Sequence, residues 1–185
     1  MRHRVGWGLG LLLAGCATSG AMGDAAARGC FDAANGRLPA EQGVRICSAA
    51  LTDSALPEAL RAATLVNRGI INMQAERLGA ALADYDAAIL AAPGNADARI
   101  NKGIALLHVG GRDAEAVAVL TEALLHNPAR PELAYYHRAI ANEALGRIRA
   151  AYDDYAEAAQ RAPDWAEPAQ QLQRFKFVRR KTLTG

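Results

Sequence analysis

A short motif recurs three times along the chain at a constant interval of 35 residues. Each copy contains an alanine, a large residue four positions later, a second alanine three positions after that, and a proline five positions further on. The copies are Ala81/Tyr85/Ala88/Pro93, Ala116/Leu120/Ala123/Pro128 and Ala151/Tyr155/Ala158/Pro163. A fixed period of this length indicates stacked units that bury their apolar faces against their neighbours. The chain is therefore expected to form an array.

The composition favours helices as the elements of this array. Hydrophobic residues make up 51% of the chain but aromatic residues only 5%, and alanine accounts for most of the difference. Such a composition argues against a sandwich or barrel. Upstream of each motif lies a small residue, Gly69, Gly103 or Ala139, which would let one helix approach its partner closely. The formal net charge of +2 argues against a nucleic-acid-binding protein.

The motif resembles the tetratricopeptide repeat (TPR), a helix-turn-helix unit of 34 residues. The resemblance implies an all-α TPR solenoid with three clear repeats in residues 57–163. A degenerate N-terminal helical pair is expected in 25–56, where Gly43, Cys47 and Ala50 keep the spacing of the motif. Residues 164–185 are expected to form a capping helix and a basic tail. A capping box from Asp164 to Glu167 would open this helix, which would run through about Arg180.

The N-terminus resembles the signal peptide of a bacterial lipoprotein. A basic start is followed by a short apolar run that ends in Leu13-Ala14-Gly15-Cys16. The resemblance implies a cleaved signal in 1–15, lipidation of Cys16 and a lipidated tether in 16–24. Ala17 replaces the Asp that favours retention in the inner membrane, which implies an outer-membrane location facing the periplasm. The alternative is an ordinary secretory signal that is cleaved between residues 21 and 27.

Two cysteines remain once Cys16 is assigned to the lipid. In TPR units, the positions of Cys30 and Cys47 face each other across the helical pair, so the resemblance implies a disulfide in an oxidising periplasm. Two buried free thiols are the alternative. A metal site is not expected, because the sequence contains no C-x-x-C motif and no histidine in this segment.

No catalytic motif is present in the sequence. His108, His126 and His137 are scattered, and we interpret the acidic pairs Asp84/Asp86 and Asp153/Asp154 as solvated helix faces. No phosphate-binding loop, nucleophile elbow or dinucleotide fingerprint occurs. The chain is expected to be a binding protein rather than an enzyme, without a metal, cofactor or small-molecule substrate.

The TPR resemblance also implies a partner-binding groove along the first helix of each pair. Its apolar side chains would be Val66, Ile70, Met73, Ile100, Ile104, Leu107, Tyr136 and Ile140. Such a stripe differs from the polar clamps that hold acidic peptide termini, and it suits a segment with apolar anchors. The alternatives are that another part of the chain covers the stripe or that it forms a dimer face. Asn72 and Asn142 are expected to bridge neighbouring helices.

Together these features predict a lipid-anchored periplasmic scaffold or adaptor that binds an envelope protein or peptide. The alternatives are an assembly factor for a secretion or pilus complex and a regulator of peptidoglycan-acting enzymes. After Pro168 the chain carries five cationic side chains and no acidic one. This basic end could contact an anionic surface, or it could be a solvated helix terminus.

Overall fold

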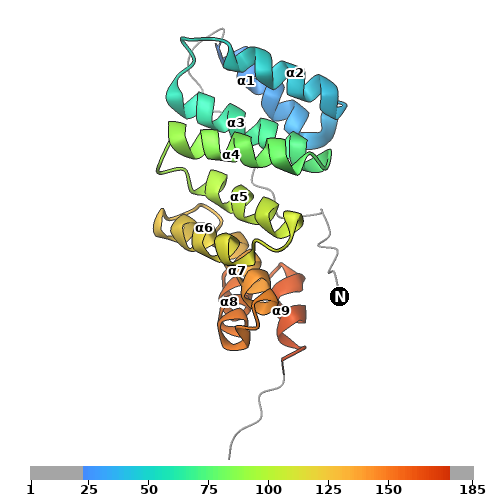
Figure 1. Ribbon diagram of the computed structural model, residues 1–185, viewed down its shortest axis with the longest axis vertical. Coiled ribbons are helices and arrows are strands. Elements are labelled where there is room, and N and C mark those ends of the chain that lie inside the picture. Colours follow the sequence, from blue (N-terminus) through green and yellow to red (C-terminus); the bar gives the residue numbers. More distant parts are fainter. Residues whose placement is uncertain (1–22, 176–185) are drawn as a thin grey trace, which may run out of the picture.

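The chain folds into helices that stack in chain order, as Figure 1 shows from α1 at one end to α9 at the other. The computed structural model describes residues 23–175, and within them it contains helices and turns but no strand. The helices are α1 (Gly23–Asp32), α2 (Ala40–Leu51), α3 (Glu58–Gln74), α4 (Leu78–Ala91), α5 (Ala96–Val109), α6 (Asp113–Leu125), α7 (Pro131–Ala144), α8 (Ile148–Arg161) and α9 (Ala166–Leu172), with a π-helical segment at Ala33–Arg37.

The helices associate in pairs and the pairs associate in sequence. Helices α3 and α4, α5 and α6, and α7 and α8 pack against each other, and each pair packs against the next through α4·α5 and α6·α7. The second helix of one pair thus contacts the first helix of the following pair. This arrangement is the stacking that the 35-residue period predicts.

Small residues set the separation of the paired helices. A Cβ atom added to Gly69 would lie 2.5 Å from Cε1 of Tyr85, and one added to Gly103 would lie 2.5 Å from Cγ of Leu120. Tyr85 and Leu120 are fully buried, so neither side chain has free space to move into. The expected role of these two glycines is confirmed, because only a glycine leaves room for the large residue of the second helix.

The N-terminal pair is held by a disulfide. Cys30 on α1 and Cys47 on α2 are joined, with their Cα atoms 4.7 Å apart, and both side chains are fully buried. These are the two cysteines that the TPR resemblance paired. A covalent loop of 17 residues stabilises a short unit by about 3 kcal/mol in the chain-entropy model. Helix α2 also packs on α3, where Ile71 fits beside Gly43.

Two expectations at the ends of the array need correction. Helix α1 begins at Gly23, so the last two residues of the expected tether are helical. The N-cap residue of α9 is Trp165, and no side-chain hydrogen bond caps the helix, so the capping box at Asp164 is wrong. Helix α9 ends at Leu172, so the expectation of a continuous helix to about residue 180 is also wrong. The signal peptide, Cys16 and the tail from residue 176 lie outside the described residues.

The linker between α6 and α7 departs from the repeat. It contains five residues, 126–130, whereas the linkers 92–95 and 162–165 contain four. At the shorter linker before α5, Asn95 caps the helix, because its side chain accepts a hydrogen bond from the Ala98 amide at 2.9 Å. The longer linker instead places Asn127 in a left-handed conformation, with φ of 49°.

Candidate protein-binding surface

Most of the predicted groove is core. Five of its eight side chains are no more than 3% exposed: Val66, Ile70, Met73, Ile100 and Ile104. The first helices of consecutive pairs contact one another directly, through α1·α3, α3·α5 and α5·α7. Because these five side chains are enclosed, they stabilise the array and cannot touch a partner in this conformation. The groove prediction is wrong for these five residues.

The other three predicted groove residues are accessible. Leu107 on α5 and Tyr136 and Ile140 on α7 are partly exposed, and all three lie in the C-terminal half of the array. Glu143, one turn beyond Ile140, is also partly exposed. We refer to Leu107, Tyr136, Ile140 and Glu143 as the C-terminal face.

Charged groups surround the polar edge of this face. Arg174 binds Glu143, and the Tyr155 hydroxyl donates a hydrogen bond to the same carboxylate at 3.2 Å. Burial, and to a smaller extent the charge of Glu167, raises the pKa of the Tyr136 hydroxyl, which stays protonated at neutral pH. The C-terminal face therefore combines apolar side chains with a rim of both charges.

Aromatic packing makes this end of the array rigid. The ring of Tyr136 lies 4.6 Å from that of Trp165 and 5.6 Å from that of Tyr155, and Phe175 packs 5.9 Å from Tyr155. These contacts hold α9 against α7 and α8. Rigid support of Tyr136 limits the conformational entropy that its surface would lose on binding.

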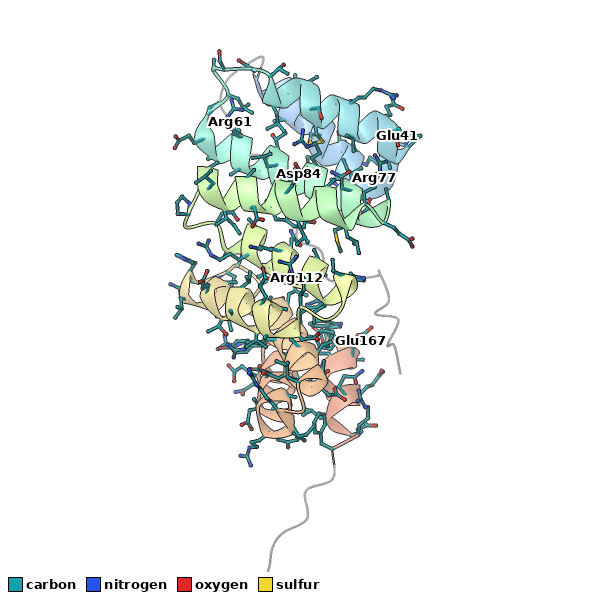
Figure 2. The ribbon with its side chains drawn as sticks, in the orientation of Figure 1. Glu41, Arg61, Arg77, Asp84, Arg112 and Glu167 are labelled. Carbon is teal, nitrogen blue, oxygen red and sulfur yellow. A yellow bond between two sulfur atoms is a disulfide. The ribbon has the colours of Figure 1, made fainter. Side chains whose placement is uncertain are left out.

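A buried polar cluster joins the helices of the first full repeat. Asp84 on α4, which is 5% exposed, accepts hydrogen bonds from the Arg68 guanidinium at 2.6 Å and from the Asn72 amide at 2.9 Å. Figure 2 shows Asp84 within the pair formed by α3 and α4. The expected bridging role of Asn72 is confirmed. The interpretation of Asp84 as part of a solvated face is wrong.

The same cluster recurs in the third repeat. Asp154 is 6% exposed and binds Arg138 at 2.7 Å and Asn142 at 3.1 Å. The solvated-face interpretation is therefore wrong for Asp154 as well, although its neighbour Asp153 is exposed. The sequence does carry a signal for this cluster, because arginine, asparagine and aspartate have the same spacing in both repeats. Each residue of the set Arg68, Asn72 and Asp84 lies 70 positions before its counterpart in the set Arg138, Asn142 and Asp154.

The cations of these clusters also connect successive repeats. Arg68 donates to Ser48 on α2 at 3.0 Å, and Arg138 donates to Thr121 on α6 at 3.1 Å. In the middle repeat Lys102 takes the equivalent place and lies 2.7 Å from Asp86 on α4. All three contacts reach the second helix of the preceding repeat. These polar groups therefore help to hold successive repeats together.

His137 is a buried histidine in the core of the third repeat. It is 4% exposed, and its ring nitrogen Nδ1 donates to the Leu133 carbonyl at 2.8 Å. Burial lowers the pKa of His137 to about 4, and the nearby His108 contributes in the same direction. The two preceding repeats carry Asn67 and Asn101 at the equivalent position. His137 is thus a neutral core residue at pH 7.

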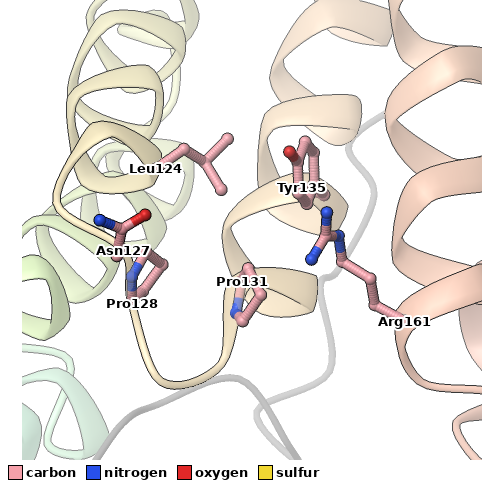
Figure 3. A pocket seen from close by; sticks show the side chains of 6 residues that line it. All are labelled: Leu124, Asn127, Pro128, Pro131, Tyr135 and Arg161. Atoms are coloured by element: carbon pink, nitrogen blue, oxygen red, sulfur yellow. The ribbon is translucent and has the colours of Figure 1, made fainter.

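A separate pocket lies at the longer linker (Figure 3). Its volume is about 240 Å³. It is lined by Leu124, Asn127, Pro128, Pro131, Tyr135 and Arg161. Figure 3 shows the Arg161 guanidinium beside the Tyr135 ring, and its central carbon lies 5.3 Å from the ring centroid. Of these six residues only Pro128 belongs to the repeated motif, and the other five carry no signal in the sequence that points to a pocket.

Between residues 25 and 175, no three His, Cys, Asp or Glu side chains are grouped so that they could hold a metal ion. None of the helices described is long and apolar enough to cross a bilayer. Membrane attachment through Cys16 concerns residues outside this region and remains a proposal.

The geometry defines a class of protein: an all-α solenoid of the TPR type. Within that class, the chain is similar to MamA, a TPR-like protein. One MamA crystal structure superposes with a TM-score of 0.66 at 17% identity, over 84% of this chain and 82% of MamA. A second, MamA AMB-1, gives 0.58 at 22% identity, over 75% and 72%. No protein-family model and no curated protein sequence matches the chain. At these identities the similarity establishes the fold alone.

Proposed function

We propose that this protein is a non-catalytic scaffold or adaptor that binds a segment of an envelope protein at its C-terminal face. The observation that carries the proposal is the accessibility of Leu107, Tyr136 and Ile140 within an otherwise buried row. Similarity to the TPR-like MamA supports the general role, because stacked helical repeats present extended surfaces to polypeptide partners.

The chemistry of the face indicates the type of segment it would bind. Leu107, Tyr136 and Ile140 supply apolar area, which favours association when water is removed from it. Glu143, Glu167 and Arg174 lie around Tyr136 and would form the polar rim. Aromatic and aliphatic anchors within a polar rim are typical of protein interfaces. A segment with two or three apolar side chains on one side would match this arrangement.

We further propose that the mature chain is attached to the outer membrane through a lipid on Cys16 and faces the periplasm. The sequence around Cys16 supports the attachment, and a disulfide between Cys30 and Cys47 suits an oxidising compartment. Each acyl methylene that enters the bilayer contributes roughly 0.8 kcal/mol, so two or three chains would hold the protein stably.

Replacing Ile140 with arginine is expected to abolish partner binding without unfolding the array. Ile140 is the suitable position, because Ile104 is only 3% exposed and an arginine there would disrupt the core. A photo-crosslinking amino acid at Leu107 would capture the partner in cells, and Ile140→Arg should reduce the captured product at least about tenfold. Circular dichroism of the purified variant checks its fold.

The matched control is Ala118→Arg, which adds the same charge at an exposed position of α6. It should leave the crosslinked product unchanged. An equal yield from wild type and a folded Ile140→Arg variant would contradict binding at the C-terminal face.

Metabolic labelling with an alkyne analogue of palmitate tests the anchor. Wild type is expected to incorporate the label and to fractionate with outer membranes, while Cys16→Ser should lose both properties because it has no sulfur to accept the lipid. Cys30→Ser is a control that leaves Cys16 intact. Label that persists in Cys16→Ser would refute the lipid anchor, whatever the result at the C-terminal face.

A further inference from the structure

The pocket lies where the α6–α7 linker meets the end of α8. Helix α6 ends one residue earlier than the period of α4 and α8 would place its end, and Asn127 in the following linker adopts a left-handed conformation. Leu124 on the last turn of α6 and Tyr135 on the first turns of α7 are partly exposed. The space between them is the cavity in Figure 3.

The lining has one apolar side and one side rich in hydrogen-bond donors. Leu124, Pro128 and Pro131 offer carbon atoms, and the Tyr135 ring adds an aromatic wall. Arg161 is the only charged residue among the six that line the pocket, and Asn127 contributes an amide. No carboxylate is among the six lining residues, and the Arg161 guanidinium, which also pairs with Glu157, can bind an anionic ligand that carries an apolar group.

Arg161 retains capacity to bind such an anion. Its side chain is 44% exposed, and Glu157 occupies its Nε and Nη2 atoms at 2.7 Å. The Nη1 amino group is not part of this ion pair. Stacking on Tyr135 holds the guanidinium in place, which reduces the entropy lost when a carboxylate binds.

We propose that this pocket binds the C-terminal residue of a partner polypeptide. The apolar side chain of that residue would lie against Leu124 and the two prolines, and its carboxylate would bind Arg161 with help from the Asn127 amide. A C-terminal residue suits the site because it carries a carboxylate and a side chain on the same carbon atom. A cavity of about 240 Å³ holds one such side chain.

The surface beside the pocket could accept the residues before that C-terminus. Leu125, which follows Leu124 on α6, is 76% exposed, and its equivalent in the preceding repeat, Leu90, is 84% exposed. Exposed leucines at the same position of successive repeats offer apolar contacts to an extended chain. This site is separate from the C-terminal face and does not depend on it.

The test uses the full-length protein and a fluorescein-labelled peptide, Gly-Ser-Gly-Ala-Leu, with either a free carboxylate or a C-terminal amide. In fluorescence anisotropy the free acid is expected to bind at least about tenfold more tightly than the amide. Arg161→Met should weaken binding of the acid about tenfold and abolish the difference between the two peptides. Asn127→Gly, which suits the left-handed backbone, should weaken it about threefold.

Arg149→Met is the matched control, because Arg149 also pairs with an acidic residue four positions away on α8, Asp153, but lies outside the pocket. It should bind both peptides like wild type, as should Ile140→Arg. Equal binding of acid and amide, or unchanged binding by a folded Arg161→Met variant, would overturn the proposal. If Ile140→Arg loses peptide binding while Arg161→Met keeps it, the peptide binds at the C-terminal face and the proposal for the pocket is wrong. If decanoate binds in a way that requires Arg161 but the peptide acid does not bind, the proposed polypeptide ligand is wrong. The pocket would then be a site for the carboxylate of a lipid.

Discussion

Replacing Asp84 with alanine is expected to lower the free energy of unfolding by about 3 kcal/mol. The substitution leaves the Arg68 guanidinium and the Asn72 amide without their common acceptor, in a site where Asp84 itself is only 5% exposed. The Arg68 side chain is 25% exposed and can recover some solvation, so we expect a value at the lower end for a broken buried pair. Chemical denaturation followed by circular dichroism measures the change.

Asp86→Ala is the matched control on the same helix. The Asp86 side chain is 57% exposed and pairs with Lys102, so its loss should change the free energy of unfolding by less than about 1 kcal/mol. The double variant Asn72→Leu/Asp84→Val should be more stable than Asp84→Ala, because it copies Leu106 and Val119 of the middle repeat. Equal destabilisation by Asp84→Ala and Asp86→Ala would contradict the structural role of the buried cluster.

Acidification is expected to destabilise the fold through His137. Its pKa in the folded state is about 4, against 6.5 for an unperturbed histidine. Between these values the unfolded chain binds more protons at His137 than the folded chain does. The contribution of neutral His137 to the free energy of unfolding is therefore complete above about pH 7 and falls as the pH approaches 4. The shift corresponds to a loss of about 3 kcal/mol, measured as the free energy of unfolding at a series of pH values.

His137→Asn should remove most of this pH dependence. The substitution introduces the residue that the two preceding repeats carry at the same position, and asparagine does not titrate. His126→Asn, at an exposed position, is the control and should retain the slope of wild type. A slope between pH 7 and 4 that is the same in His137→Asn and wild type would show that other groups cause the acid sensitivity.

The helical hairpins could be predicted because their determinants are local and repeated. Gly69 with Tyr85 and Gly103 with Leu120 are separated by similar distances in the sequence, and each pair identifies a close helix contact. The bridging role of Asn72 and Asn142 followed from their recurrence at positions that face the core. A periodic pattern reports which side of a helix faces its own partner.

The partner surface could not be predicted to the same degree. The TPR resemblance placed the groove along the first helices, but it did not indicate how closely α3 and α5 would pack against their neighbours. Ile104 and Ile140 occupy equivalent positions, yet Ile104 is core and Ile140 is partly exposed. Their difference depends on the elements that surround each repeat, and these lie far away in the sequence.

Asp84 and Asp86 show the same limit within one helix. Two residues of separation place their side chains on different sides of α4, and both read as polar in the sequence. Only the position of Arg68 on the adjacent helix makes one of them a buried acceptor. The pocket at Arg161 likewise requires the linker after α6 and the end of α8 to meet, although they are more than 30 residues apart.

The sequence by itself determined the helical repeat, the pairing of helices within each repeat and the close contacts at Gly69 and Gly103. These features depend on side-chain size at a regular spacing, and that spacing can be read directly from the sequence. The tertiary structure alone decided which groove residues remain accessible, which carboxylates are buried and where the array leaves a pocket. Those properties depend on how much space and solvent remain once neighbouring repeats have packed, and packing between distant segments has no local sequence signature.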